Sequence, residues 1–196
     1  RSGMLATRIS YINDLAVVAE KLNIDIAHVQ QGMAADNRIG LSYLSPGAGF
    51  GGENFSHDIL TLANTVSGTG VKSQLLAQVW DINEQQKELL FRKLWNYFHG
   101  DLKDKTVAIW GASFKENTSR IQQSPIHMML NALWAQGVKV RLHDPQALIE
   151  IEALYGQRDD LRLCHDQYQA VQGAHALCLL TAWKQYWSPD YTRLHQ

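Results

Sequence analysis

Residues 73–98 contain neither glycine nor proline, the two residues that most often interrupt a helix. Their side chains mark one stripe at steps of three and four residues, which is typical of a helix with one buried face. At 1.5 Å per residue this helix would be roughly 40 Å long, and a helix of that length usually bridges two domains or builds a dimer. We therefore expect two domains, residues 1–99 and 100–196, joined by this helix. The stripe consists of Leu76, Val79, Trp80, Asn83, Lys87, Leu90, Phe91, Leu94 and Phe98.

The first domain is predicted to be all-α. From Met4 to about Leu22 apolar residues recur with helical spacing, and Asp25 is a candidate N-cap for a second helix. A short third helix is predicted over residues 57–66. We expect Trp80, Phe91 and Trp95 of the long helix to bury a subunit interface, which would make this a dimerisation domain. The apolar face predicted for the first helix consists of Leu5, Ile9, Ile12, Leu15, Ala16 and Ala19.

The second domain begins after a polar turn at residues 100–105, where strand and helix patterns start to alternate. This alternation predicts a parallel sheet with helices on its faces, a Rossmann-like α/β arrangement. Because the chain ends within what should be the next helix, we expect this domain to be incomplete. The predicted strands are residues 106–110, 138–142, 161–164 and 176–180, and the predicted helices are residues 125–135, 147–155 and 168–172.

Composition favours an ordinary water-soluble chain. The 196 residues carry a formal charge of -1 and contain no run of basic residues, so nothing indicates binding to nucleic acid or to an anionic membrane. No apolar stretch approaches the roughly 20 residues of a membrane span, and two cysteines cannot form a disulfide framework. We expect a cytoplasmic protein. The start at Arg1 suggests that the sequence is part of a longer one.

A glycine-rich segment formally matches the dinucleotide fingerprint at Gly47, Gly49 and Gly52. That fingerprint works only between a strand and a helix, whereas helical patterns precede this segment and Pro46 adjoins it. We therefore reject NAD binding here and expect either close approach of the backbone to a ligand or a purely structural loop. The segment after the first strand of the second domain has a single glycine, Gly111, which is too weak a signal for NAD.

The same segment, Gly47-Ala-Gly-Phe-Gly-Gly-Glu-Asn-Phe-Ser-His-Asp58, resembles the active-site loop of the UDP-glucose/GDP-mannose dehydrogenase family. Further resemblances follow in the correct order: residues 5–14, Arg38-Ile-Gly40, residues 83–87, and a Gly-x-x-Phe-Lys-x-x-Thr pattern from Gly111 that leads to Ser124-Pro125. The resemblance covers nearly the whole chain. It implies the central and C-terminal domains of an NAD-dependent enzyme that oxidises a nucleotide sugar to a uronate.

In that family a cysteine of this loop attacks the sugar aldehyde, but this chain has Asn54 at that position. A carboxamide has no accessible anion and cannot replace a thiolate. His57, Ser56 and Ser2 stand where the family has lysine, proline and asparagine, and Asp58 alone is retained. The resemblance therefore implies a degenerate catalytic site with no intact nucleophile.

The resemblance also implies binding roles. Arg38 would reach the nucleotide sugar of a neighbouring subunit, while Phe114 and Lys115 would close the site from the last domain. Each has a simpler alternative: a solvated loop charge, a core aromatic ring and a surface lysine, respectively. The loop residues expected to line the substrate through their backbone amides run from Ser45 to Gly51 and include Gly49 and Phe50.

No intact cofactor site is expected in this chain. Gln122 stands where the family has an arginine that meets the NAD pyrophosphate, and Arg120 stands where it has an aspartate. The family's NAD domain would lie before Arg1, so this chain alone should need no cofactor. No metal site is expected either, because His57 and Asp58 have no further ligand at a spacing of three or four.

Three functions remain open. The first is a homodimeric, catalytically silent relative of the nucleotide-sugar dehydrogenases that keeps a vestigial sugar-nucleotide pocket. The second is part of an active NAD-dependent enzyme with altered loop chemistry, which the retained Asp58 and the glycines favour. The third is an interaction module in polysaccharide biosynthesis. Cys164 and Cys178 are doubtful replacement nucleophiles, because a cysteine such as Cys178 within an apolar strand is usually an inert core residue.

Overall fold

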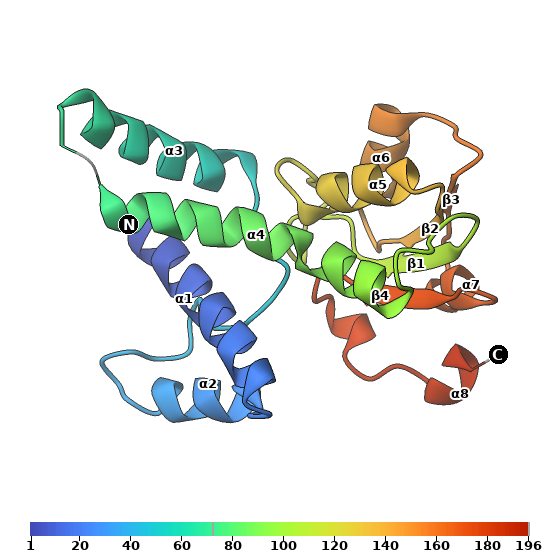
Figure 1. Cartoon of the computed structure of the whole chain (residues 1–196), viewed down its shortest axis with the longest axis horizontal. Helices are drawn as coiled ribbons and strands as arrows, with labels where there is room; N and C mark the ends of the chain where they lie inside the picture. Colours follow the sequence, from blue (N-terminus) through green and yellow to red (C-terminus); the bar gives the residue numbers. More distant parts are fainter. Residues whose placement is uncertain (72, 196) are drawn as a thin grey trace. The chain divides into compact units, whose positions relative to one another are not determined.

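The computed structural model describes residues 1–71 and 73–195. The chain divides into two compact units, Arg1–Gln86 and Lys87–Gln196. As predicted, a helical region is followed by an α/β domain with a parallel sheet (Figure 1). The long helix, α4, spans Gln74–Tyr97 and has residues on both sides of the division, so the domain boundary expected after residue 99 stays a prediction.

The first unit consists of helices. They are α1 (Ser2–Lys21), α2 (Ile26–Ala34), α3 (Glu53–Gly68) and the first part of α4. Asp25 is the N-cap of α2, as predicted, and its carboxylate accepts a hydrogen bond of 2.9 Å from the amide of Ala27. This bond satisfies one of the backbone donors that every helix start leaves without an internal partner.

The buried face of α1 differs from the predicted one. Of the predicted residues, only Ile12 and Ala19 are fully buried, and Ala6, Ser10 and Asn13 are buried beside them. The two polar side chains are tolerated there because they bind backbone groups. The hydroxyl of Ser10 donates to the carbonyl of Val79 over 2.8 Å, and hydrophobic spacing does not register such a contact.

Helix α3 begins at Glu53 rather than at His57. The prediction relied on the apolar residues Ile59, Leu60 and Leu62 and therefore missed the polar first turn. As a consequence, Asn54 lies within the same helix as His57 and Asp58 and not in a loop before it.

The second unit alternates strands and helices as predicted, and the bounds of β1 and α5 are those expected. Helix α5 starts sharply because Ser124 caps it, accepting from the amide of Ile126 over 3.2 Å, and Pro125 occupies its first turn. The elements are β1 (Thr106–Trp110), α5 (Pro125–Ala135), β2 (Lys139–His143), α6 (Leu148–Tyr155), β3 (Leu161–Leu163), α7 (Gln167–Val171), β4 (Ala176–Leu179), a 3-10 helix η1 (Lys184–Tyr186) and α8 (Tyr191–Leu194).

The four strands are parallel in the order β3-β2-β1-β4. Helices α5 and α6 lie over one face of the sheet, and α7 lies over the other (Figure 1). The face under α5 and α6 holds the main core, which includes Val107, Ile109, Val140 and Leu142. The chain moves from β1 outward to β2 and β3 and then returns to β4 on the other side of β1. This reversal places a topological switch point at the carboxyl ends of β1 and β4, where open α/β sheets commonly bind ligands.

The backbone segments that follow β1 and β4 lie close together at that switch point. Gly111, directly after β1, has a φ of +103°. A Cβ atom on Gly111 would lie 2.5 Å from both the backbone nitrogen and the Cβ of Thr181, which follows β4. Only glycine fits this position, because both the dihedral angle and the approaching backbone exclude a side chain.

We predict that Gly111→Ala destabilises the protein by about 3 kcal/mol or more, since the φ strain adds to a clash with backbone that cannot rotate away. Chemical denaturation followed by tryptophan fluorescence measures the change in the free energy of unfolding. The matched control is Gly173→Ala. Gly173 has a φ of +71° and no neighbouring atom within 4 Å of the added Cβ, so this variant should lose only about 1 kcal/mol. Equal losses for the two variants would contradict the proposed role of the close approach.

Candidate functional site

The glycine-rich segment of the first unit is fixed by amide side chains from two helices. The side chain of Asn83 in α4 accepts from the amide of Phe50 over 2.7 Å and donates to the carbonyl of the same residue over 3.0 Å. Asn13 in α1 accepts from the amide of Gly47 over 2.9 Å, and Gln86 in α4 donates to the carbonyl of Gly47 over 2.8 Å. The segment is therefore held at Gly47 and at Phe50 by hydrogen bonds that depend on tertiary structure.

These three anchors were not predicted as site residues. A signal was present for Asn83, which with Lys87 is one of two polar residues in the stripe of the long helix. In the structure it is only 1% exposed, and it satisfies both backbone groups of Phe50. A buried amide side chain is stable in such a position only when its hydrogen bonds are made.

Phe50 is a core residue. Its ring packs edge-on against Phe55 and Trp80, with ring centres 5.3 and 6.1 Å apart, in a cluster that also includes Ile59 and Val79. Its backbone amide is bound by Asn83, and that of Gly47 by Asn13. Both amides are thus engaged within the protein rather than free to line a substrate.

The other predicted loop residues lie around this anchored core. Ser45 is exposed and its hydroxyl accepts from the side chain of Gln30 over 3.0 Å. Gly49 is half-buried with a φ of +108°, and Gly51 is buried. The positive φ explains the need for glycine at position 49.

Asn54 lies in the first turn of α3 and is exposed. Asp58 follows it by four residues and His57 by three, so the three side chains share one face of the helix. The carboxylate of Asp58 accepts from the hydroxyl of Ser2 over 2.8 Å, and the ring of His57 lies 3.3 Å from the hydroxyl of Thr61. The structure thus brings the retained aspartate to the same helical face as the position that the family motif fills with cysteine.

Arg38 is paired with a neighbour in sequence. Its guanidinium binds the carboxylate of Asp36 through Nη2–Oδ2 (2.6 Å) and Nε–Oδ1 (3.0 Å) contacts, and the side chain is 89% exposed. The hydrogen bond raises the pKa of Arg38 and lowers that of Asp36. Arg8 fixes the following segment by donating to the carbonyls of Gly40 and Ser42, each over 2.8 Å.

In the second unit, the carboxylate of Asp144 organises the carboxyl edge of the sheet. Its Oδ2 accepts from the amides of Ala112 and Ser113 over 2.7 and 3.0 Å. Its Oδ1 accepts from the amides of Gln146 and Ala147 over 2.9 and 2.8 Å. Asp144 is buried, and the loops after β1 and β2 are therefore tied to a single side chain.

A buried aromatic group lies beside Asp144. The indole of Trp183 is 3.2 Å from its Oδ2, and the ring of Tyr186 stacks on Trp110 with ring centres 4.9 Å apart. The hydroxyl of Tyr186 lies 2.6 Å from Nδ1 of His143. Burial lowers the pKa of His143, so this imidazole is neutral near pH 7.

The predicted residues of the second unit lie on the long loop after β1. Phe114 is half-buried, and its amide donates to the carbonyl of Arg120 over 3.0 Å. The Nζ atom of Lys115 lies 5.5 Å from the centre of the Phe114 ring, and both Lys115 and Gln122 are exposed. The structure brings Phe114 and Lys115 together as a cation–π pair.

The loop after β1 does not fit the pyrophosphate of NAD. A dinucleotide site needs free amides at this turn and at the start of the following helix. Here Asp144 takes the amides of Ala112 and Ser113, and Ser124 caps α5.

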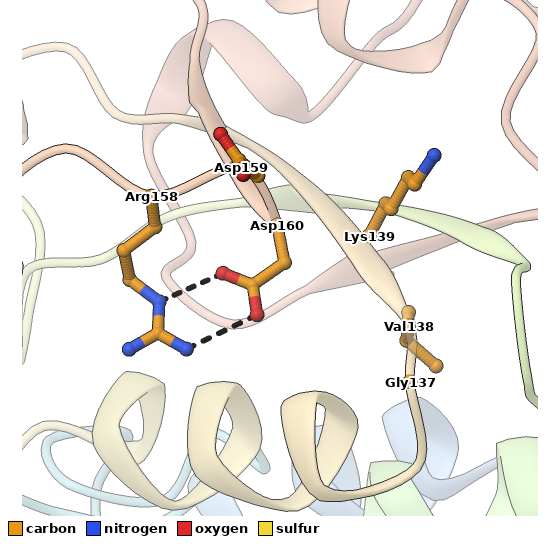
Figure 2. Close-up of a pocket in the computed structure, with 6 residues that line it drawn as sticks. All are labelled: Gly137, Val138, Lys139, Arg158, Asp159 and Asp160. Atoms are coloured by element: carbon orange, nitrogen blue, oxygen red, sulfur yellow. Dashed lines mark hydrogen bonds and ion pairs between the residues drawn. The ribbon is translucent and has the colours of Figure 1, made fainter.

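A shallow surface hollow lies at the opposite, amino edge of the sheet (Figure 2). None of the predicted site residues line it. Arg158 and Asp160 close one side through two hydrogen bonds, while Lys139 and Asp159 extend away from this pair. The hollow is lined by Gly137, Val138, Lys139, Arg158, Asp159 and Asp160.

Other classes of site find no support among the residues that the structure describes. Within them, no three histidine, cysteine or acidic side chains gather as metal ligands. None of the described helices is long and apolar enough to cross a membrane. Cys164 and Cys178 are both buried, and burial raises the pKa of Cys178 to about 12, so neither is a reactive thiolate.

Comparisons with known proteins agree with both units. Residues 1–85 match the model of the UDP-glucose/GDP-mannose dehydrogenase family, central domain, and residues 108–196 match the UDP binding domain of the same family. A UDP-glucose 6-dehydrogenase of Pseudomonas aeruginosa is 39% identical over 98% of this chain, which covers 43% of that protein. The Bacillus subtilis UDP-glucose 6-dehydrogenase TuaD is 32% identical over 93% of this chain, which covers 39% of that protein.

A solved structure leads to the same assignment. The UDP-glucose dehydrogenase from the hyperthermophilic archaeon Pyrobaculum islandicum has a TM-score of 0.91 at 28% identity, over 97% of this chain and 43% of that one. The chain thus spans less than half the length of these relatives. Because both family matches lie in order and together include most of the sequence, the chain belongs to the UDP-glucose/GDP-mannose dehydrogenase family, of which it carries the central and UDP-binding domains.

Proposed function

We propose that this chain binds a nucleotide sugar and does not oxidise it. The observation that carries the proposal is Asn54, an exposed carboxamide in the first turn of α3 at the position where the family motif has its cysteine. Partial positive charge at a helix start stabilises a thiolate, and so favours a nucleophile at this place. An amide nitrogen is delocalised into its carbonyl and gains no nucleophilicity from the same field.

No other thiol replaces the missing one. Cys164 and Cys178 are buried in the second unit, and burial raises the pKa of both. His57 lies on the same helix face as Asn54, but its ring contacts Thr61, and no acid of the described residues forms an ion pair with it. Covalent capture of an aldehyde therefore lacks a candidate residue among the side chains described.

Retention of binding is supported by the intact scaffold around the loop. The bonds from Asn13, Asn83 and Gln86 hold the glycine-rich segment in a defined conformation. A preformed segment binds a ligand without first losing conformational entropy. We propose that Ser45, Gly49 and Gly51 contribute to this site, together with Arg38. For the UDP-binding domain, taken by itself, we propose that Phe114 and Lys115 contact a nucleotide sugar.

A second candidate is an NAD-dependent enzyme that uses different loop chemistry. Asp58 favours it, because this carboxylate is exposed, bonded to Ser2 and placed one turn after Asn54. A carboxylate can orient a water or accept a proton without a covalent intermediate. Such an enzyme would release the aldehyde rather than convert it to an acid.

We expect UDP-glucose to bind with a Kd of roughly 10 to 500 μM, the range of ordinary substrate affinities. Isothermal titration calorimetry measures the affinity, and absorbance at 340 nm with added NAD should show no NADH. Lys115→Ala should weaken binding by about tenfold, the value of one charged hydrogen bond. Steady NADH formation would overturn the proposal in favour of the second candidate, and an absence of binding to any UDP- or GDP-sugar would overturn both.

Position 54 can be probed directly with a thiol. In Asn54→Cys, the new thiol should react with iodoacetamide at pH 7 several-fold faster than the thiol of Leu60→Cys, because the helix start lowers its pKa. Leu60 is exposed on the same helix, about two turns later, and serves as the matched control. Labelling is quantified by intact-mass spectrometry, with the unmodified chain as the blank for Cys164 and Cys178. Equal rates at positions 54 and 60 would show that this turn does not activate a nucleophile.

We further propose a homodimer formed through the first unit and the long helix. Trp80 and Phe91 pack within their own units, which leaves Trp95 as the partly exposed member of the three predicted interface aromatics. Helix α1 adds an apolar stripe at steps of seven residues, Met4, Tyr11 and Val18, which are about half exposed or more. An apolar stripe of this kind usually marks a protein interface.

Sedimentation velocity tests this assembly. The unmodified chain should sediment as a dimer, and Tyr11→Asp combined with Val18→Asp should give a monomer with an unchanged circular-dichroism spectrum. Glu20→Gln, a change at an exposed position on the opposite face of the same helix, should leave the dimer intact. If the unmodified chain stays monomeric at micromolar concentration, the proposed homodimer is refuted.

A further inference from the structure

Two arginines face each other on neighbouring strands of the second unit. Arg141 in β2 and Arg162 in β3 are partners in the parallel register. Their strand neighbours Val140, Leu142 and Leu163 belong to the core under α5 and α6, so the alternation of side chains places both arginines on the opposite face. Helix α7 covers that face, and it is only five residues long.

The surroundings of Cys164 agree with the placement of both arginines on the α7 face of the sheet. Burial raises the pKa of this thiol, and the charges of Arg162 and Arg141 oppose the rise. Cys164 packs with Ala108 and Ala170, the latter a residue of α7. Both guanidinium groups therefore lie near the α7 side of the sheet, at strands that are separated by about 4.8 Å.

Neither arginine of this pair forms an ion pair with a residue that the structure describes. Asp160 is bound by Arg158 over 2.7 and 3.0 Å, and Asp166 is paired with Arg193 over 3.4 Å. Among the residues that the structure describes, no carboxylate forms an ion pair with Arg141 or Arg162. Like charges directly opposite each other on adjacent strands destabilise a sheet.

One of the two guanidinium groups is held in place. Nη1 of Arg141 donates to the carbonyl of Gln172, the residue that follows α7. This contact uses one of the five N–H donors of an arginine and leaves the others for a ligand. Arg162 is exposed, and its guanidinium forms no ion pair with a described carboxylate, so it can approach the same ligand.

We propose that Arg141 and Arg162 form an anion site that binds a phosphate group, either as inorganic phosphate or as a phosphate monoester. The planar fork of arginine matches phosphate oxygens, and two adjacent forks can bind one dianion with several charge-assisted hydrogen bonds. The site lies on the sheet face under α7 and is independent of the nucleotide-sugar proposal.

A protective role for the charges does not account for the pair. Charged residues on edge strands prevent sheets from pairing with other molecules, which would explain Arg162 in the edge strand β3. Arg141 lies in β2, an inner strand hydrogen-bonded on both sides, where no such protection is needed. A ligand that bridges the two charges explains both positions.

The test is titration of the whole chain with sodium phosphate and, separately, with glycerol 2-phosphate, at constant ionic strength maintained with sodium chloride. Thermal unfolding followed by tryptophan fluorescence reports the ligand-dependent rise in Tm. We expect either anion to raise Tm in a saturable way. Arg162→Gln and Arg141→Gln should each increase the apparent Kd by about tenfold or more. Whichever anion binds more tightly identifies the source of the phosphate group.

A second readout separates a binding site from a surface charge. In chloride at low ionic strength, Arg162→Gln should raise Tm by about 1 to 4 °C, because it relieves the repulsion between the guanidinium groups. Arg120→Gln removes the same charge from the exposed loop after β1 and should change neither the phosphate response nor this Tm.

Two outcomes would overturn the site. One is a rise in Tm with phosphate that is no larger than the rise with chloride, and the other is an equal phosphate response in the unmodified chain and in both arginine variants. The affinity of the chain for UDP-glucose should be the same in Arg162→Gln as in the unmodified chain. A failure of nucleotide-sugar binding would therefore not count against this anion site. Likewise, a failure of phosphate binding would not count against the proposed nucleotide-sugar site.

Discussion

The second unit depends on one buried carboxylate that satisfies backbone amides from two loops. Asp144 accepts from the amides of Ala112 and Ser113 after β1 and from those of Gln146 and Ala147 after β2. Without it, four N–H groups at the carboxyl edge of the sheet would need other partners, and each unsatisfied buried donor costs about 1 to 3 kcal/mol. The same bonds direct these amides inward. In dinucleotide-binding folds the turn after the first strand holds phosphate through its amides. Here the amides of this turn bind Asp144 instead.

In the first unit, amide side chains satisfy the backbone groups of the glycine-rich segment. This difference between local and tertiary contacts explains which features could be predicted from the sequence. Strand β1 and helix α5 could be predicted to the residue, because a buried apolar run and a Ser-Pro cap are local signals. The buried face of α1 and the anchors of the glycine-rich segment could not. Asn13 and Asn83 are buried only because distant backbone groups meet them, and that meeting is decided by tertiary structure.

In the candidate site, too, some features could be predicted from the sequence and others depend on tertiary contacts. The resemblance of the sequence located the loop, the aspartate at position 58 and the asparagine at position 54, and family models match both domains around them. It did not reveal that Phe50 is a core residue whose amide is bound by Asn83. The loop is thus held by contacts that do not involve the residue at position 54. A nucleophile could be lost from this place with little effect on stability, since an exposed side chain in the first turn contributes little to packing.

The arginine pair on the sheet face under α7 differs from position 54, because these two residues act against the stability of the sheet. The side chain at position 54 is exposed and contributes little to packing, whereas Arg141 and Arg162 place like charges side by side in an ordered sheet. Uncharged polar residues would fit a half-exposed sheet surface without that repulsion. Local features that work against stability are expected mainly where a function requires them. The unfavourable geometry of these two charges therefore supports the proposed ligand more strongly than the mere presence of two arginines does.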